Sequence, residues 1–441
     1  MKFSAPRGTK DILPEEAARW QWLEAQFREQ CRLYGFQEIR TPLFEETELF
    51  ARSTGEETEI VTKQMYTFTD RGGRSLTLRP EGTPGVVRAY LQSGMADKGG
   101  VQRLFYFGPF FRYERPQAGR FRQFHQAGVE VFGTGGPQMD AEVIALLLDF
   151  LKSLGIEGAV LKINSTGCKV CREVYREALR KALAPVLDQL CEWCQERYKG
   201  NTLRILDEKR PSCRALFGEL PSILDYLDEG CKEHFAGLRA QLDLLEIPYE
   251  IDSKIVRGLD YYSRTVFEVS QPGIGAQDAL GGGGRYDNMM EEFGGKPTPA
   301  VGWAAGVDRI MGALFDQKKN KDVEEFLLQI RRHHAYSLSP KVFIVNIGLE
   351  ARRYILPLLN ALHNAQISAI DDPLGRSPKT QMKEAAQRNC RWAVIIGENE
   401  SRQGIVKLHD MESGSESDIN RDNLAQELRK RLAEEKKATT E

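Results

Sequence analysis

Several features that mark other classes of protein are missing from this sequence of 441 residues. The longest apolar stretch, residues 143–151, is interrupted by Asp149 and falls far short of the roughly 18 residues that a membrane span needs. The first residues hold no apolar core of signal-peptide length, because Lys10 and Asp11 bring charge back at once. These absences argue against a membrane or secreted protein, and we expect a cytoplasmic protein with no membrane partner.

Cysteine and net charge are also scarce. Eight cysteines are too few for a disulfide scaffold, and a reducing compartment keeps most of them as thiols. The 61 lysines and arginines nearly balance 63 acidic residues, which excludes a uniformly basic protein but leaves a local basic face open. The apolar content of 41% and the chain length indicate about two or three folded domains.

Hydrophobic patterning predicts an α+β protein, a mixed sheet with flanking helices. Helical spacing of apolar residues predicts a helix over 15–33 and another over 141–154. Runs rich in aromatic and branched residues, bounded by glycine or proline, predict strands over 36–39, 101–111, 127–132 and 159–163. From Cys168 to about Leu245 the pattern is helical with charged faces, which predicts a helical insertion in that sheet.

The second half of the chain contains a clear change of composition. A charged and serine-rich stretch separates the first domain from a region where strand and helix patterns alternate, typical of an α/β domain. We expect the following organisation: a first domain over 1–325, a linker over 326–340, an α/β domain over 341–433 that ends in a helix over 424–432, and a frayed polar tail over 434–441.

The segment 107–132 is unusually dense in arginine and aromatic residues. A guanidinium group keeps its charge and offers a planar fork of donors, so several arginines beside an aromatic ring suit the phosphates and base of a nucleoside triphosphate. The alternative is a solvated hairpin whose arginines only pair with acidic residues. Both interpretations remain open on composition alone.

Two further segments combine glycine with polar recognition groups. Four consecutive glycines at 281–284 precede Arg285, Tyr286 and Asp287, which indicates close approach of the backbone to another group, with a flexible hairpin turn as the alternative. Residues 300–310 predict a glycine-marked strand that turns into a helix.

Taken in order, six segments resemble the histidyl-tRNA synthetase family. They are its class II motifs and histidine-specific signatures: 7–11, 78–83, 112–130, 257–262, 283–287 and 302–309. Together with the α/β domain, the resemblance covers nearly the whole chain. It implies the class II synthetase fold, an antiparallel sheet with flanking helices, and a C-terminal α/β anticodon-binding domain. It also implies a homodimer with residues 36–50 at the interface.

The resemblance implies a histidine–tRNA ligase. The carboxylate of L-histidine attacks the α-phosphate of ATP to give histidyl-adenylate and pyrophosphate, and histidine then passes to the 3′ end of tRNA(His). Mg²⁺ on the phosphates follows from this chemistry.

Roles carry over by position in the matching motifs. Arg112 and Arg257 act at the α-phosphate as the catalytic residues. The ATP-binding set is Arg112, Glu114, Arg120, Phe124 and Arg309. The histidine-binding set is Glu81, Thr83, Gln126, Glu130, Arg257, Tyr262 and Tyr286, in which Glu130, Tyr262 and Tyr286 recognise the imidazole. Gln117 and Arg122 match positions that meet the tRNA acceptor end.

Four cysteines have the spacing of a zinc site. Cys168-x-x-Cys171 and Cys191-x-x-Cys194 would supply four thiolates, with Cys213 as a possible substitute. One unbroken helix between the pairs would hold them about 30 Å apart, so the chain must reverse, and Pro185 is a suitable place for a helical hairpin. The alternative is a set of reduced thiols packed as small apolar groups.

Two other functions are alternatives to a histidine–tRNA ligase. A regulatory subunit of ATP phosphoribosyltransferase uses the same fold to bind histidine, but it would be expected to lack the arginines and the C-terminal domain. A class II synthetase for another amino acid conflicts with the signatures at 257–262 and 283–287.

Overall fold

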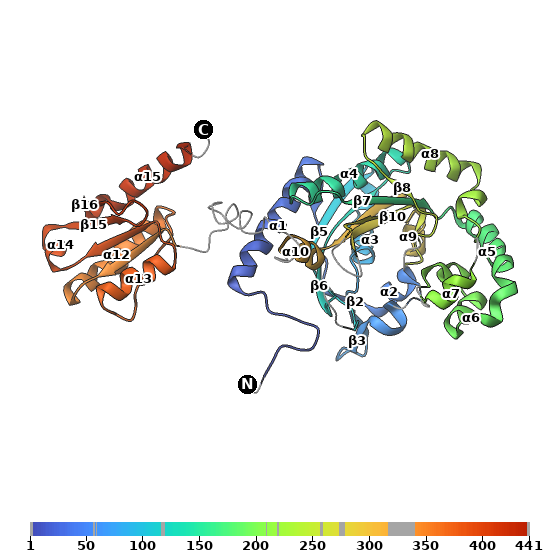
Figure 1. The fold of residues 1–441 in the computed structure, drawn as a ribbon, viewed down its shortest axis with the longest axis horizontal. Helices are drawn as coiled ribbons and strands as arrows, with labels where there is room; N and C mark the ends of the chain where they lie inside the picture. Colours follow the sequence, from blue (N-terminus) through green and yellow to red (C-terminus); the bar gives the residue numbers. More distant parts are fainter. Residues whose placement is uncertain are drawn as a thin grey trace. The chain divides into compact units, whose positions relative to one another are not determined.

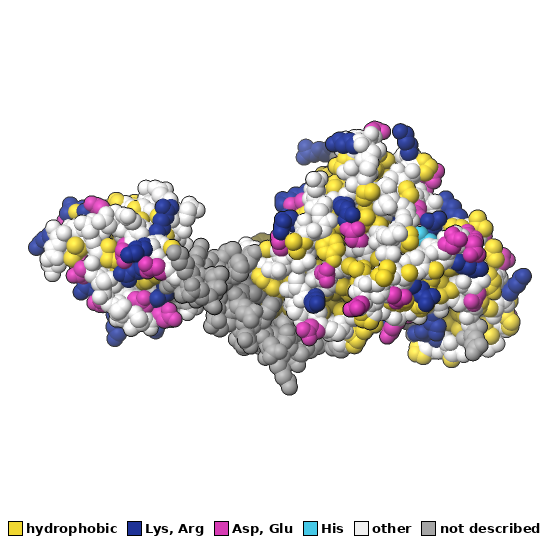
Figure 2. All heavy atoms as spheres, turned by 90° about the horizontal axis from the view of Figure 1, so that it is seen from above, with side chains coloured by type: hydrophobic (Ala, Val, Ile, Leu, Met, Phe, Trp, Pro, Cys, Tyr) yellow, Lys and Arg dark blue, Asp and Glu magenta, His cyan; other side chains and the backbone are white. Residues whose placement is uncertain are grey.

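The computed structural model describes residues 3–55, 58, 60–115, 120–208, 210–217, 220–255, 259–272, 278–315 and 340–438. The chain divides into two compact units, Met1–Leu327 and Leu328–Glu441 (Figure 1). Among the described residues no helix is long and apolar enough to cross a membrane. Basic and acidic side chains are interspersed on the visible face of each unit, as the near-neutral composition predicts (Figure 2).

The first unit is organised around a large sheet, which confirms the predicted fold class. The described part of this sheet has eight strands in the order β1-β5-β6-β11-β10-β9-β7-β8, and all neighbours are antiparallel except the pairs β1–β5 and β7–β8. The strands are β1 (Gln37–Glu38), β5 (Gln102–Phe111), β6 (Gln123–Phe132), β7 (Val160–Ser165), β8 (Glu250–Ile251), β9 (Ser263–Ser270), β10 (Ala279–Arg285) and β11 (Ala300–Gly306).

Helices α1 (Pro14–Leu33) and α4 (Pro137–Ser153) cover this sheet through an aromatic core. Measured between ring centroids, Phe27 of α1 lies 5.1 Å from Phe150 of α4 and 6.0 Å from Trp303 of β11. All three side chains are buried, and such contacts between large rings contribute strongly to core stability. The helices of this part of the unit are α1 (Pro14–Leu33), α2 (Thr47–Thr54), α3 (Thr83–Gln92), α4 (Pro137–Ser153), α9 (Met289–Glu292) and α10 (Val307–Phe315).

A small antiparallel sheet, absent from the sequence-based prediction, precedes α3. It consists of β2 (Phe44–Glu46), β3 (Tyr66–Thr69) and β4 (Ser75–Leu78), in the order β2-β4-β3. These strands are three or four residues long and mostly exposed, so the alternation in YTFT and SLTL is too short to indicate a strand by itself.

The four glycines at 281–284 lie in β10, a strand between β9 and β11, and do not form a hairpin turn. The expected close approach is present, because a Cβ atom on Gly283 would lie 2.0 Å from the carbonyl oxygen of Gly302. The absence of side chains therefore lets the backbone of β11 pack closely against β10.

The predicted helical insertion is confirmed between β7 and β8. Figure 1 shows its helices at the side of the unit opposite α1. They are α5 (Lys169–Leu183), α6 (Glu192–Lys199), α7 (Pro211–Leu216) and α8 (Glu229–Leu244). The chain leaves α5 through a short 3₁₀ turn, Ala184–Gln189, that contains Pro185, so the helix is interrupted where the sequence favours a reversal.

The second unit is an α/β domain, as predicted. Its described sheet has five strands in the order β13-β12-β14-β15-β16. The elements are β12 (Val342–Asn346), α12 (Leu349–Asn364), β13 (Ala369–Asp371), α13 (Pro378–Gln387), β14 (Trp392–Ile396), α14 (Glu398–Gln403), β15 (Ile405–Asp410), β16 (Glu416–Asn420) and α15 (Leu424–Ala438). Helix α15 continues past Glu434, where we expected a frayed tail, because the residues there are strong helix formers.

Candidate active site

A cavity of about 280 Å³ opens in the first unit beside β5, β6, β10, β11 and α10. Most of the side chains assigned to ATP and histidine line it: Glu81, Thr83, Arg112, Glu114, Arg120, Phe124, Gln126, Tyr262, Tyr286 and Arg309. Residues that lie far apart in the sequence are therefore brought together in one cavity.

The other assigned residues are not among the described residues that line the cavity. Arg257 and Gln117 lie outside the described residues, and Glu130 is buried next to the lining residues Thr83 and Tyr286. Arg122 packs its guanidinium over the ring of Tyr113, 3.9 Å from the centroid, and donates to the carbonyl of Glu114 rather than lining the cavity.

Glu130 of β6 contacts two residues that line the cavity, Thr83 and Tyr286. Its side chain is buried, and it accepts hydrogen bonds from the hydroxyl of Thr83 at 2.7 Å and from the hydroxyl of Tyr286. Burial raises the pKa of Glu130 to about 8, although these two hydroxyls act in the opposite direction. A carboxyl group held in this way can exchange a proton near neutral pH, which suits recognition of an imidazole ring.

Glycine makes room for this carboxyl group. Gly302 of β11 lies opposite Glu130 in the sheet, and a Cβ atom there would come within 1.9 Å of the Glu130 Oε2 atom. Likewise, Cβ atoms on Gly82 and Gly128 would each come within 2.3 Å of the Tyr106 ring. These glycines therefore give Glu130 and Tyr106 the space to approach the cavity.

A second buried acid, Glu81, lies nearby. It accepts from the hydroxyl of Thr54 at 2.7 Å and from the hydroxyl of Tyr261 at 2.8 Å. Burial raises the pKa of Glu81, while Thr54 and the positive charge of Arg112 lower it. Sequence reasoning missed Thr54, Tyr106 and Tyr261 as site residues. Tyr261 lay inside a motif already singled out, whereas Thr54 and Tyr106 carried no signal in the sequence.

Three arginines, Arg112, Arg120 and Arg309, also line the cavity. Arg112 donates to the carbonyl of Pro80 at 2.8 Å and lies over the ring of Phe124, and Arg309 donates to the carbonyl of Ala279 at 2.9 Å. Arg120 lies 3.4 Å from the carboxylate of Glu114. Burial, and then the like charges of Arg120 and Arg112, lower the pKa of Arg309. A bound polyanion would relieve this repulsion.

Four buried polar atoms on residues that line the cavity have no hydrogen-bond partner among the described residues. They are the hydroxyl oxygen of Tyr106, the Nε atom of Arg120, the Nδ1 atom of His125 and the Oε1 atom of Gln126. Buried polar atoms are almost always paired, so the cavity offers both donors and acceptors to a polar ligand.

The predicted single four-cysteine site is not formed, and this expectation needs correction. Cys168 and Cys171 lie with Asp228 and Cys231, whereas Cys191 and Cys194 lie with Glu208 and Cys213. The reason is the length of α5, about 22 Å at 1.5 Å per residue, which keeps the two pairs apart. Each pair is met instead by a later segment of the insertion.

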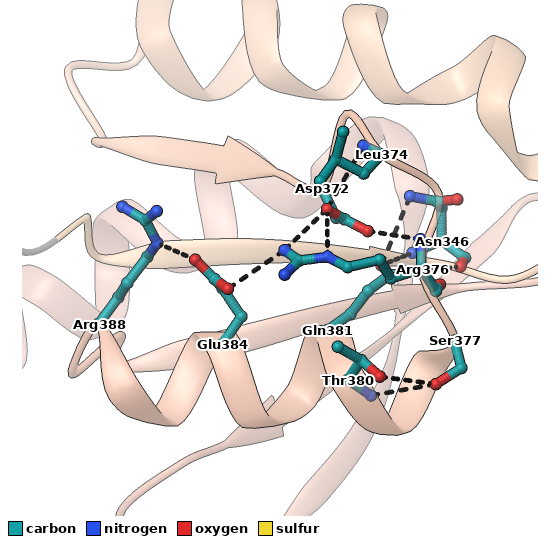
Figure 3. A network of polar contacts seen from close by, with 9 residues as sticks. All are labelled: Asn346, Asp372, Leu374, Arg376, Ser377, Thr380, Gln381, Glu384 and Arg388. Atoms are coloured by element: carbon teal, nitrogen blue, oxygen red, sulfur yellow. Dashed lines mark hydrogen bonds and ion pairs between the residues drawn. The ribbon is translucent and has the colours of Figure 1, made fainter.

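In the second unit, ion pairs and hydrogen bonds hold the loop that follows β13 in place (Figure 3). Arg376 binds Asp372 at 2.9 Å and Glu384 at 3.1 Å, and its backbone N–H donates to Asp372. The side chain of Gln381 donates to the carbonyls of Asn346 and Arg376. This network fixes the loop between β13 and α13.

Comparison with known proteins agrees with this geometry. A model of the family described as histidyl-tRNA synthetase matches residues 8–310, and a model described as an anticodon binding domain matches residues 341–431. The histidine–tRNA ligase of Pelotomaculum thermopropionicum is 48% identical over 99% of this chain and 100% of its own length, and that of Desulforudis audaxviator is 48% identical over 98% and 99%.

Solved structures give the same result. The apo histidyl-tRNA synthetase of S. aureus is 38% identical, with a TM-score of 0.79 over 96% of this chain and 99% of that one. A Bacillus halodurans structure described as an ATP phosphoribosyltransferase regulatory subunit/histidyl-tRNA synthetase, at 21% identity and a TM-score of 0.62, shares the fold. Matches of this length and identity establish that the chain belongs to the histidyl-tRNA synthetase family.

Proposed function

We propose that this chain is a histidine–tRNA ligase that activates L-histidine with ATP and transfers it to the 3′ end of tRNA(His), in the cytoplasm. The observation that carries the proposal is one cavity lined by three guanidinium groups and by Tyr286, whose hydroxyl donates to the buried Glu130. The guanidinium groups suit a triphosphate. The Glu130–Tyr286 pair suits an imidazole, which has one donor and one acceptor nitrogen.

In the first step, a carboxylate oxygen of histidine bonds to the α-phosphorus of ATP while the bond to pyrophosphate breaks. Negative charge develops on the phosphate oxygens, where Arg112 stabilises it in a cavity that excludes much water. Arg257 takes the same task by resemblance. Arg120 and Arg309 hold the outer phosphates, and Phe124 with Arg309 encloses the adenine ring.

At the amino-acid end, Glu81, Thr83 and Gln126 hold the α-ammonium group and substrate backbone. Glu130, Tyr262 and Tyr286 recognise the imidazole. An incorrect amino acid would leave these buried groups unpaired, which discriminates far better than cavity size.

The carboxylates of Glu114 and Glu268 line the same cavity as the arginines. Carboxylate oxygens are ligands that Mg²⁺ accepts, so the donor set fits this ion. When bound, Mg²⁺ supplies neutralisation of phosphate charge, and Glu114 and Glu268 would hold it.

The partners follow from both units. Gln117 and Arg122 contact the acceptor end of tRNA, and the domain over 341–433 contacts the anticodon. A homodimer through residues 36–50 is supported by the exposed rings of Phe44 and Phe68, which contact each other edge-to-face at 6.3 Å on the small sheet. Zinc, if resident, lies at cysteines outside the cavity.

The test is ATP–pyrophosphate exchange by the purified full chain with each amino acid in turn, followed by charging of tRNA(His). We expect exchange with histidine alone. Exchange with another amino acid would overturn the assigned specificity. Histidine binding without exchange would instead indicate a regulatory protein on the same fold.

A further inference from the structure

We propose that the helical insertion contains two separate metal sites, each holding one zinc-type divalent ion by three thiolates and one carboxylate. The Asp228 site consists of Cys168, Cys171, Asp228 and Cys231. The Glu208 site consists of Cys191, Cys194, Glu208 and Cys213. The two sites replace the single site that the cysteine spacing predicted.

The spacing of the donor atoms suits one ion in each site. Within each group, one donor atom from every residue lies within 4.8 Å of the others. Four donors around tetrahedral zinc at a Zn–S length near 2.3 Å are separated by about 3.8 Å. The Sγ atoms of Cys168 and Cys171 are 3.5 Å apart, close to this value. A [4Fe–4S] cluster binds each thiolate to a different iron and so needs wider spacing.

The backbone of the Asp228 site is arranged to support thiolate ligands. The N–H of Asp228 donates to the Sγ atom of Cys171 at 3.1 Å. Gly167, at φ +64°, precedes the first ligand, and a Cβ atom there would come within 2.5 Å of the Cβ atom of Cys171. Hydrogen bonds to the ligating atoms are characteristic of metal sites, because they orient the ligands and stabilise the thiolate charge.

The Glu208 site surrounds a buried carboxylate with sulfur atoms. The Oε2 atom of Glu208 lies 3.4 Å from the Sγ atom of Cys191 and 3.3 Å from that of Cys194. Its Oε1 atom accepts from the N–H of Arg210 at 2.8 Å, which leaves Oε2 directed at the sulfurs. The N–H of Cys191 donates to Cys213 Sγ at 3.5 Å. A divalent cation would offset the combined negative charge of these ligands once the thiols are ionised.

Each site joins segments that are distant along the insertion. The Asp228 site connects the start of α5 to the start of α8, and the Glu208 site connects the start of α6 to α7. Because the apolar core of the insertion is built partly from these cysteines, two bound ions would join its segments and add to its stability.

The insertion in turn holds a loop of the active site. Arg172, next to Cys171, donates to the carbonyl of Tyr262 at 3.1 Å, and Arg204 binds Asp260 at 2.9 Å. Tyr262 lines the cavity assigned to histidine. The two ions would therefore fix the positions of the arginines that support this loop.

The test is the zinc content of the purified full chain, measured by inductively coupled plasma mass spectrometry. We expect two ions per chain in the wild type, and one in each of Cys231→Ser and Cys213→Ser. Cys390→Ser is the matched control, because Cys390 is buried in the second unit outside both groups, and it should keep both ions.

A single ion that both variants retain would overturn the proposal in favour of a shared site of Cys168, Cys171, Cys191 and Cys194. No bound ion after purification without chelators and after incubation with zinc would also overturn it.

If either variant fails to fold, the test is instead the binding of Co²⁺ to the wild-type chain, followed by absorption spectroscopy. Two Co²⁺ ions with thiolate charge-transfer absorption and strong tetrahedral bands are expected. One ion only, or the weak spectrum of an octahedral site, would contradict two tetrahedral sites.

Discussion

Arginine clusters occur in both units, and they differ in what surrounds them. In the active-site cavity, Arg309 is buried near Arg120 and Arg112, and burial with these like charges lowers its pKa. In the second unit, hydrogen bonding to Asp372 raises the pKa of Arg376 (Figure 3). Positive charge is therefore concentrated in the cavity, where Glu114 and Glu268 offset part of it, whereas the charge of Arg376 is neutralised within its own domain.

The difference shows how to separate a binding arginine from a structural one. Arg376 forms ion pairs with Asp372 and Glu384 of its own domain, so its charge is neutralised within the fold. Arg309 lies near two like charges, and a ligand with several negative charges would lower the energy of the three cavity arginines. The acidic partners of Arg376 lie within 8 residues of it along the chain, whereas the like charges near Arg309 come from a distant segment.

The largest expected effect comes from the cavity cluster. Arg112→Ala should slow ATP–pyrophosphate exchange by roughly 10²–10³-fold, because one preorganised charge at the α-phosphate is lost. Arg376→Ala is the matched control and should leave exchange unchanged. Equal loss in both variants, with both folded by circular dichroism, would remove the distinction between the clusters.

Glu130→Gln should raise the KM for histidine by roughly 10–10²-fold, with a smaller change in the KM for ATP, because an acceptor for the imidazole becomes a poorer one. Steady-state exchange kinetics measure both constants. An equal rise in the two KM values would place Glu130 outside specific recognition of histidine.

The pKa of Glu130 gives a pH prediction for the ligand-free chain. Because folding raises this pKa from 4.5 to about 8, its contribution to stability is complete below pH 4.5 and is lost as pH rises through about 8. The melting temperature of the wild type should therefore fall relative to Glu130→Gln across this range. Parallel curves of melting temperature against pH would contradict the buried, protonated carboxyl group.

Gly302→Ala tests the space around the same carboxyl group. The added methyl group would meet the Glu130 Oε2 atom, so we expect about 1–3 kcal/mol of destabilisation and a higher KM for histidine. Gly312→Ala, where a Cβ atom has open space, is the control in unfolding by urea. Wild-type stability and KM in Gly302→Ala would show that Glu130 can move without cost.

The smallest effect is expected at the second cluster. Hydrogen bonding to Arg376 lowers the pKa of Asp372, so its contribution to stability is present above its ordinary pKa of 3.8 and is lost as pH falls. Asp372→Asn should lower the melting temperature of the second unit by a few degrees near pH 7, and less in acid. A larger loss in acid than at pH 7 would contradict this assignment.

Much of the fold was predictable, because long elements with regular apolar spacing dominate it. The helix over 15–33 and the strands over 101–111 and 127–132 were found within a few residues. The small sheet β2-β4-β3 was missed because its strands are short and exposed. The glycine strand β10 was ambiguous, since glycine has no side chain to show an alternating pattern.

The site was predictable only where residues lie in a recognisable motif. Glu81, Glu130 and Tyr286 came from such motifs. The structure places Glu81 and Tyr286 in one cavity with the arginines, and Glu130 accepts a hydrogen bond from Tyr286 there. The cysteine groups could not be predicted, because the sequence shows which cysteines are near neighbours along the chain but not which later segment returns to them. Asp228 and Glu208 were two acidic residues among 63.

The order of strands in the large sheet also affects how this protein folds while it is being synthesised. β6 ends at Phe132, and its partner β11 begins only at Ala300. At translation rates of about 5–20 residues per second, the hairpin β5–β6 waits roughly 10–30 s for that partner. During this interval one edge of β6 is unpaired and open to other chains. We therefore expect the nascent chain, more than the finished enzyme, to depend on chaperones.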